Sequence, residues 1–189
     1  AAATNTQRSD APKGSVWIKQ IFHTLCWIRA FLEGKTGSIV RLFLVSNYAG
    51  QGSELRLVTD ACPWGLGGFF SIDHWIIGYF AIEINDFEFK LFKHQKGDAA
   101  GQQTWEALAI LIGLKLFSKH WQKARAELEV RPDNLTALSM ILCMKGKGYG
   151  VNLVARELAL VLSDGAFRPE VVTHIAGSSN VVADALSRK

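Results

Sequence analysis

Three short apolar segments joined by very short connections are the feature of this chain that most limits its fold. Residues 55–59 alternate between apolar and polar side chains, and residues 67–72 and 75–84 follow after stretches that contain turn residues. Alternation with tight turns predicts an antiparallel meander of three strands. The chain must therefore build a sheet whose first three strands are consecutive in sequence.

The second half of the chain alternates helical and extended patterns. Apolar residues recur at helical spacing over 102–121, and a strand is expected over 126–130. Residues 85–100 are expected to form a polar connection with scattered aromatic residues. The remaining expected elements are helices over 135–144, 151–162 and 179–188 and a strand over 171–175. This order predicts an α/β fold with a five-stranded mixed sheet, three strands antiparallel and then two parallel, flanked by helices.

The residues before the meander divide into two parts. Residues 1–14 are small and polar, and they are expected to be disordered or to be the end of a fragment. Residues 15–54 form an N-terminal extension that opens with a helix over 15–33, and residues 55–189 form the main domain. The extension helix carries an apolar stripe of Trp17, Ile21, Leu25 and Ile28. Such a stripe is expected to pack against the main domain or against a protein partner.

Charge and cysteine content narrow the class of protein. The net charge of the chain is +4, and residues 1–59 carry all of it. These residues contain seven Lys and Arg and three Asp and Glu, whereas residues 60–189 contain fourteen basic and fourteen acidic residues and are neutral overall. A basic extension is compatible with a nucleic-acid partner. Three separated cysteines argue against a disulfide framework or a zinc site and favour an intracellular location, nuclear or cytoplasmic. No apolar run reaches the length that a membrane span needs.

Four acidic residues lie near the ends of the expected elements. Asp60 follows the first strand, Glu106 lies near the start of the long helix, Asp133 follows the fourth strand, and Asp184 lies in the last helix. Each of them also fits a structural role as a turn residue, a helix cap or an exposed helix residue. Neighbouring parallel strands bring their carboxyl ends to one edge of a sheet, where ligands bind. Carboxylates gathered there would suit hard cations such as Mg²⁺.

The last segment of the chain resembles a known motif. Residues 174–188 read HIAGSSNVVADALSR, which is similar to the closing motif of the ribonuclease H (RNase H) domain in reverse transcriptases of gypsy-type and DIRS-type retrotransposons. The segments around Asp60, Glu106 and Asp133 resemble the other three motifs of this family, in the family's order. The resemblance covers residues 55–188, about 70% of the chain. The departures are Cys62 where the family often has Ser, Pro132 before Asp133, and the connection 85–100.

The resemblance implies an RNase H-like fold and endonucleolytic hydrolysis of the RNA strand of RNA–DNA hybrids. It implies a site with two Mg²⁺ ions, for which Mn²⁺ can substitute, held by the four acids Asp60, Glu106, Asp133 and Asp184. His174 would assist proton transfer or product release. The residues expected to bind the substrate are Gln103, Asn134, Lys145, Lys147 and Asn180.

Two other functions compete with this interpretation. A domesticated RNase H-like module, with a structural or nucleic-acid-binding role in a larger assembly, would normally have lost some of the acids. A DDE-type integrase is disfavoured by the closing Ala-Asp-Ala-Leu-Ser-Arg sequence. Residues 15–54 resemble the connection that joins a polymerase to RNase H, and no polymerase motif is present. The expected partners are therefore an RNA–DNA hybrid and a polymerase region of a longer polyprotein, or an assembly partner.

Overall fold

The computed structural model describes residue 14 and residues 18–35, 45–49, 51–121, 126–132, 148–164, 167–168 and 179–189. The chain divides into two compact units, Ala1–Val40 and Arg41–Lys189. The first contains helix α1 (Ile18–Leu32). The elements described in the second are α2 (Val45–Tyr48), β1 (Leu55–Ala61), β2 (Gly65–Ile72), β3 (Trp75–Glu83), α3 (Asp86–Phe92), η3 (Ala99–Gly101), α4 (Gln102–Leu116), η4 (Ser118–His120), β4 (Ala126–Pro132), α6 (Tyr149–Asp164), β5 (Phe167–Arg168) and α7 (Val181–Ser187).

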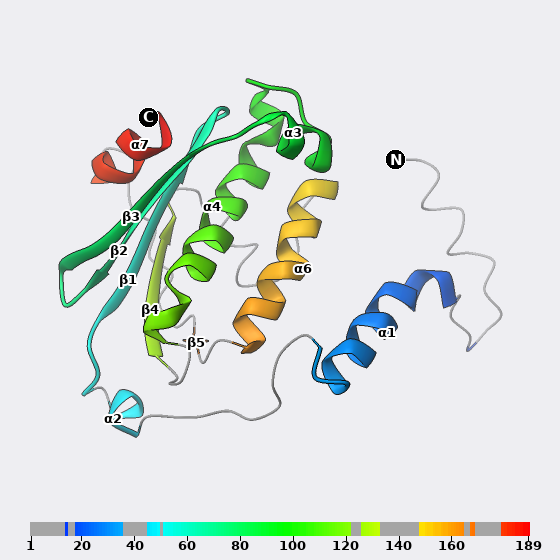
Figure 1. The fold of residues 1–189 in the computed structure, drawn as a ribbon, viewed down its shortest axis with the longest axis horizontal. Coiled ribbons are helices and arrows are strands. Elements are labelled where there is room, and N and C mark those ends of the chain that lie inside the picture. The colour runs from blue at the N-terminus through cyan, green and yellow to red at the C-terminus, as the bar shows by residue number, and fades with distance from the viewer. Residues whose placement is uncertain are drawn as a thin grey trace. The chain divides into compact units, whose positions relative to one another are not determined.

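A mixed sheet with the strand order β3-β2-β1-β4-β5 forms the centre of the second unit (Figure 1). β1 pairs antiparallel with β2 and parallel with β4, and β2 pairs antiparallel with β3. β5 has only two residues and runs parallel to β4, so the sheet consists of four full strands and one short segment. The predicted α/β class, with antiparallel strands first and parallel strands later, is confirmed. The strand expected over 171–175 and the helix expected over 135–144 lie outside the described residues.

The meander forms where the sequence pattern predicts it. β2 and β3 are joined by Asp73 and His74, whose φ angles are 48° and 71°. Positive φ at both turn residues is typical of the two-residue hairpin whose twist matches that of the strands. β1 is longer than expected and ends at Ala61, so Asp60 lies inside the strand rather than after it.

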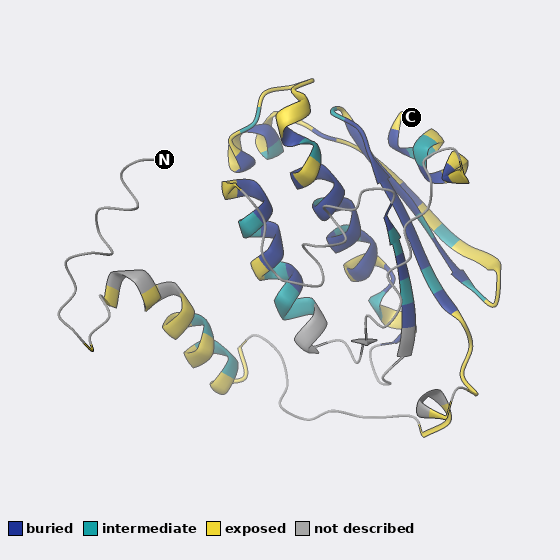
Figure 2. Cartoon of the chain, turned by 180° about the vertical axis from the view of Figure 1, so that it is seen from behind, coloured by how far each residue is buried: buried dark blue, intermediate teal, exposed yellow. Residues whose placement is uncertain are grey.

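Helices cover both faces of the sheet. α4 packs on one face with α6 against it, and α7 lies on the other face (Figure 1). Buried residues line the sheet and the inner sides of α4 and α6, with Leu57, Phe70, Ile110 and Val130 almost fully inaccessible (Figure 2). α4 passes so close to β1 that a Cβ at Gly113 would lie 2.8 Å from the Leu57 side chain. This packing places the first turns of α4 beside the carboxyl end of β1.

The segment 85–100 differs from its prediction as a polar connection. It contains the helix α3, which begins with a capping box: the Asn85 side chain accepts from the Phe87 N–H and the Glu88 side chain accepts from the Asn85 N–H. Phe89 and Phe92 are buried edge-on against the Trp105 ring of α4, at centroid distances of 5.4 and 5.6 Å. The aromatic residues of this segment are therefore the buried face of a short helix, which a seven-residue pattern could not reveal.

Helix α1 carries the apolar residues that the sequence predicted for the extension. Ile18, Ile21, Phe22, Leu25, Ile28 and Leu32 are its exposed large apolar residues. Trp17 precedes the helix and is outside the described residues. Among the described ranges, no helix has both the length and the apolar character needed to cross a bilayer.

Candidate active site

Asp60 is a buried carboxylate in the central part of the sheet. It is 4% exposed and pairs across the antiparallel ladder with Gly67 of β2. A side chain at Gly67 would point into the backbone of α7, and cross-strand partners share one face of a sheet, so Asp60 lies on the α7 face. An ionised carboxylate is costly to bury unless hydrogen bonds or cations stabilise it.

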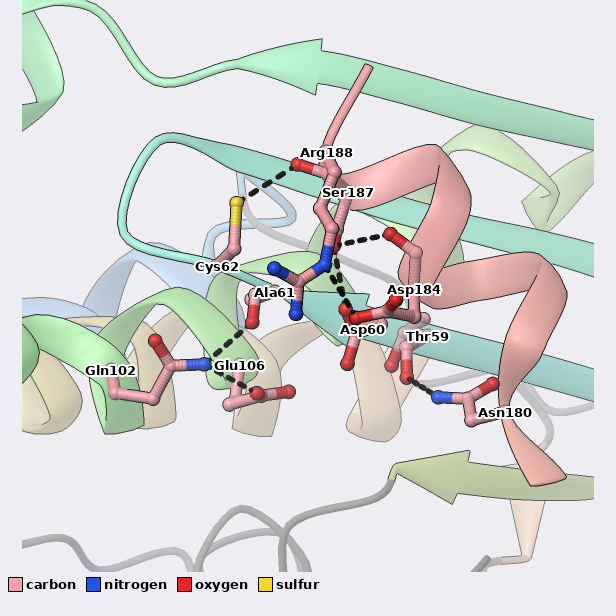
Figure 3. Close-up of polar contacts among 10 residues, drawn as sticks. All are labelled: Thr59, Asp60, Ala61, Cys62, Gln102, Glu106, Asn180, Asp184, Ser187 and Arg188. Carbon is pink, nitrogen blue, oxygen red and sulfur yellow. Dashed lines mark hydrogen bonds and ion pairs between the residues drawn. The ribbon is translucent and has the colours of Figure 1, made fainter. Parts of the chain in front are cut away.

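The C-terminal residues of α7 hold this carboxylate. The Ser187 hydroxyl lies 2.6 Å from Asp60 Oδ2 and 2.9 Å from the backbone carbonyl oxygen of Asp184, and Ser187 is itself 3% exposed (Figure 3). Asp60 and α7 are 120 or more residues apart in sequence, so the tertiary fold brings them together.

Asp184 lies on the same helix and is half-buried. Its Oδ1 accepts a hydrogen bond of 2.8 Å from Arg188 Nε, one helical turn later (Figure 3). Asp184 raises the pKa of the Arg188 guanidinium through this bond and its charge, and the nearby Asp60 charge adds to the effect. The exposed Arg188 side chain is therefore a cation paired with Asp184 and close enough to Asp60 to feel its charge.

Glu106 reaches the same end of β1 from the opposite face. It lies in the second turn of α4, is 2% exposed, and accepts a 2.8 Å hydrogen bond from Gln102 Nε2. The same amide group donates to the Ala61 carbonyl at 2.5 Å (Figure 3). A side-chain amide has two hydrogens, so Gln102 can satisfy both acceptors and tie Glu106 to the residue after Asp60.

Two of the expected substrate-binding residues are described. Asn180, at the start of α7, is buried, and its Nδ2 donates to the Thr59 carbonyl at 3.2 Å, which docks α7 on β1. Gln103 is exposed and lines a hollow of about 190 Å³ together with Lys93, His94 and Tyr149. Whether either residue contacts a nucleic acid stays a prediction.

The other predicted residues lie outside the described part of the chain. They are Asp133, Asn134, Lys145, Lys147 and His174. β4 ends at Pro132, which is in register with Thr59, and Asp133 is the next residue in sequence. Within the described ranges, no three His, Cys, Asp or Glu side chains are grouped closely enough to hold a metal ion. The four-carboxylate site therefore stays a prediction.

The described acids nevertheless have the right chemistry for a cation. Asp60, Glu106 and Asp184 offer the hard oxygen donors that Mg²⁺ and Mn²⁺ take from proteins. Asp60 and Glu106 also keep their carboxylates in a water-poor environment. The donor set thus fits a divalent cation.

A wide hollow of about 1010 Å³ opens beside the end of α7. Its lining includes Cys62, Trp64, Tyr79, Ser187 and Arg188. Cys62 is buried, and its Sγ lies 3.0 Å from the Ser187 carbonyl oxygen. Trp64 and Tyr79 are exposed, so this hollow presents aromatic faces and a guanidinium next to the acids.

Sequence reasoning missed three residues that shape this site. Gln102, rather than its neighbour Gln103, contacts Glu106, and the i to i+4 spacing of the two was a usable signal. Ser187 and Arg188 stood in the closing motif without an assigned role. The contact of Arg188 with Asp184 has the same i to i+4 spacing and could have been foreseen, whereas the contact of Ser187 with Asp60 depends on how α7 docks on the sheet.

Comparison with known proteins finds matches among solved structures only. No family model and no curated protein matches the sequence. RNase H1 from the halophilic archaeon Halobacterium salinarum NRC-1 has a TM-score of 0.52 and 13% identity, over 70% of this chain and 93% of that protein. The N-terminal RNase H domain of a Mycobacterium tuberculosis protein gives a TM-score of 0.47 at 13% identity, covering 69% and 95%. The foamy viral protease-reverse transcriptase in complex with dsDNA gives 0.35 at 15% identity, covering 90% and 35%. The likeness to the archaeal protein shows that this chain has an RNase H-like fold.

Proposed function

We propose that this chain is a metal-dependent ribonuclease H that cleaves the RNA strand of RNA–DNA hybrids and that it is part of a retroelement reverse transcriptase. The observation that carries the proposal is the buried Asp60 carboxylate of the central strand, held by the helix that bears Asp184. The RNase H-like fold supports it, and so does the sequence resemblance of four acidic motifs in family order.

The chemistry assigned to the site follows from its carboxylates. A divalent cation, when bound, supplies an activated water and charge stabilisation at the scissile phosphate. Asp60, Glu106 and Asp184 would hold it together with Asp133. Gln102 keeps the Glu106 carboxylate at the carboxyl end of β1. Discrimination of RNA from DNA would rest on 2′-hydroxyl contacts in the minor groove of the hybrid, to which we assign Gln103.

The assignment to a larger polypeptide rests on the N-terminal unit. α1 exposes an apolar stripe, and such surfaces mark contacts with other proteins. We assign residues 15–54 to a connection that joins the RNase H domain to a polymerase region. The proposal includes the segment boundaries predicted from the sequence, which fall between residues 14 and 15 and between residues 54 and 55.

A cleavage assay tests the proposed activity. The full chain, freed of metal with EDTA, is mixed with a hybrid labelled on its RNA strand, and MgCl₂ or MnCl₂ is then added. Cleavage is expected only with added cation, should leave 3′-hydroxyl and 5′-phosphate ends, and should spare the DNA strand and double-stranded DNA.

The cleavage assay, combined with a mobility-shift experiment, distinguishes a nuclease from a domesticated module. A module of that kind would bind the hybrid in a mobility-shift experiment and leave it intact at every cation concentration. Cleavage that persists in excess EDTA would equally contradict the proposal, since no cation would then be needed.

A further inference from the structure

We infer that Ser187 is a positioning residue for the predicted metal ligand Asp60 and that its hydroxyl sets the cation affinity of the site. The inference rests on the proposed function, because it assigns a role toward the cation that the proposed reaction needs. Ser187 itself is not expected to touch the cation or the nucleic acid, since it is 3% exposed and lies where α7 packs on the sheet.

The Ser187 hydroxyl has one hydrogen and two acceptors within reach. Asp60 Oδ2 is at 2.6 Å and the Asp184 carbonyl oxygen is at 2.9 Å. The shorter contact is to the charged group, and hydrogen bonds to an ionised acceptor are shorter and stronger than neutral ones. The hydroxyl is therefore expected to donate its hydrogen mainly to the Asp60 carboxylate. The contact with the Asp184 carbonyl oxygen is then the weaker of the two.

The backbone of Ser187 is fixed against the sheet. A Cβ at Gly67 would lie 2.3 Å from the Ser187 nitrogen, and a Cβ at Gly65 would lie 2.3 Å from the Ser187 carbonyl oxygen. That oxygen also lies 3.0 Å from Cys62 Sγ. Two glycines without side chains thus let the end of α7 rest directly on β2. The donor that faces Asp60 has little freedom to move.

A fixed donor orients a carboxylate that would otherwise turn. The outer torsion of an Asp side chain is broad, so the direction of its oxygens is set by what they contact. Groups that hydrogen-bond to metal-ligating carboxylates orient them, and their loss typically weakens metal binding by 10- to 100-fold. Ser187 has the place and the chemistry of such a group toward Asp60.

The experiment compares three variants of the full chain for Mn²⁺ binding by isothermal titration calorimetry, with the thermal midpoint of the metal-free protein measured alongside. Ser187→Ala removes the hydroxyl. Ser187→Cys keeps the size of the side chain and replaces the hydroxyl with a weak donor. Ser118→Ala is the matched control, because the Ser118 hydroxyl makes the analogous contact with a carbonyl three residues earlier, that of Lys115, at 2.8 Å.

Both Ser187 variants are expected to raise the dissociation constant for Mn²⁺ by about 10- to 100-fold, while Ser118→Ala leaves it unchanged. A lower thermal midpoint with an unchanged dissociation constant in either Ser187 variant would show a purely structural role and overturn the inference. If the wild-type chain binds no Mn²⁺, the result contradicts the proposed function and therefore also the inference that rests on it. Binding by wild type and variants with equal affinity overturns the inference alone.

Discussion

Asp60→Asn is expected to lower cleavage of the RNA strand by about 1,000-fold or more while leaving the fold intact. A bound cation contributes several kcal/mol of transition-state stabilisation, and each ~1.4 kcal/mol is a factor of ten in rate. The amide keeps the size of the carboxylate and can still accept from Ser187, which donates to Oδ2 at 2.6 Å. It lacks the charge that a hard divalent cation requires.

Single-turnover cleavage of a labelled hybrid measures this loss, with circular dichroism as the check on folding. Asp86→Asn makes the same change at an exposed acid in the first turn of α3 and should cleave like the wild type. An Asp60→Asn protein that cleaves at the wild-type rate would mean that this carboxylate does not serve the reaction.

Gly67→Ala is expected to displace α7 and thereby to lower the cleavage activity of the site, although Gly67 is not one of the predicted metal ligands. A Cβ at this position would lie 2.3 Å from Ser187 N, 2.6 Å from Leu186 C and 2.7 Å from Ala183 O, all of them backbone atoms. Overpacking of this kind costs roughly 1–3 kcal/mol of unfolding free energy. Since α7 carries Asp184 and Ser187, cleavage should also fall by about 100-fold, the effect of a catalytic group moved by about 1 Å.

Gly68→Ala provides the matched control on the neighbouring residue of β2. Its Cβ would point to the other face and meet the Phe80 ring at 2.7 Å and the Val58 carbonyl at 2.8 Å. Urea denaturation should show a loss of stability for both variants, and only Gly67→Ala should lose Mn²⁺ affinity and cleavage beyond that loss. Equal effects on binding in the two variants would contradict a specific role for the α7 contact.

The sheet could be predicted from the sequence because its signals are local. Residues 55–59 alternate, and turn residues separate the apolar segments that follow. The structure forms β1, β2 and β3 over this region, with a two-residue hairpin at Asp73 and His74. The helices expected over 102–121 and 151–162 are also found, as α4, which ends earlier than expected at Leu116, and as α6. Several short elements could not be foreseen, α3 and β5 among them. Helix α3 has only seven residues, and the two-residue β5 exists only through its pairing with β4.

The motifs predicted the acids of the candidate site, and the role of these acids as metal ligands stays a prediction, whereas the groups that hold the acids could not be predicted. Asp60 lies on β1, Glu106 on α4 and Asp184 on α7, the kinds of element that the motifs predicted for them. The groups that orient these acids depend on contacts across more than 40 residues of sequence, such as Gln102 with Ala61 and Ser187 with Asp60. Helical periodicity and strand alternation carry no information on such pairs.

The most direct test of the central claim is an anomalous difference map from crystals of the full chain grown with MnCl₂. The account predicts Mn²⁺ density coordinated by the carboxylates of Asp60 and Asp184, and the loss of that density in crystals of Asp60→Asn. Well-ordered Asp60 and Asp184 side chains with no Mn²⁺ between them, or Mn²⁺ bound only elsewhere on the protein, would contradict a metal-dependent active site at this end of the sheet.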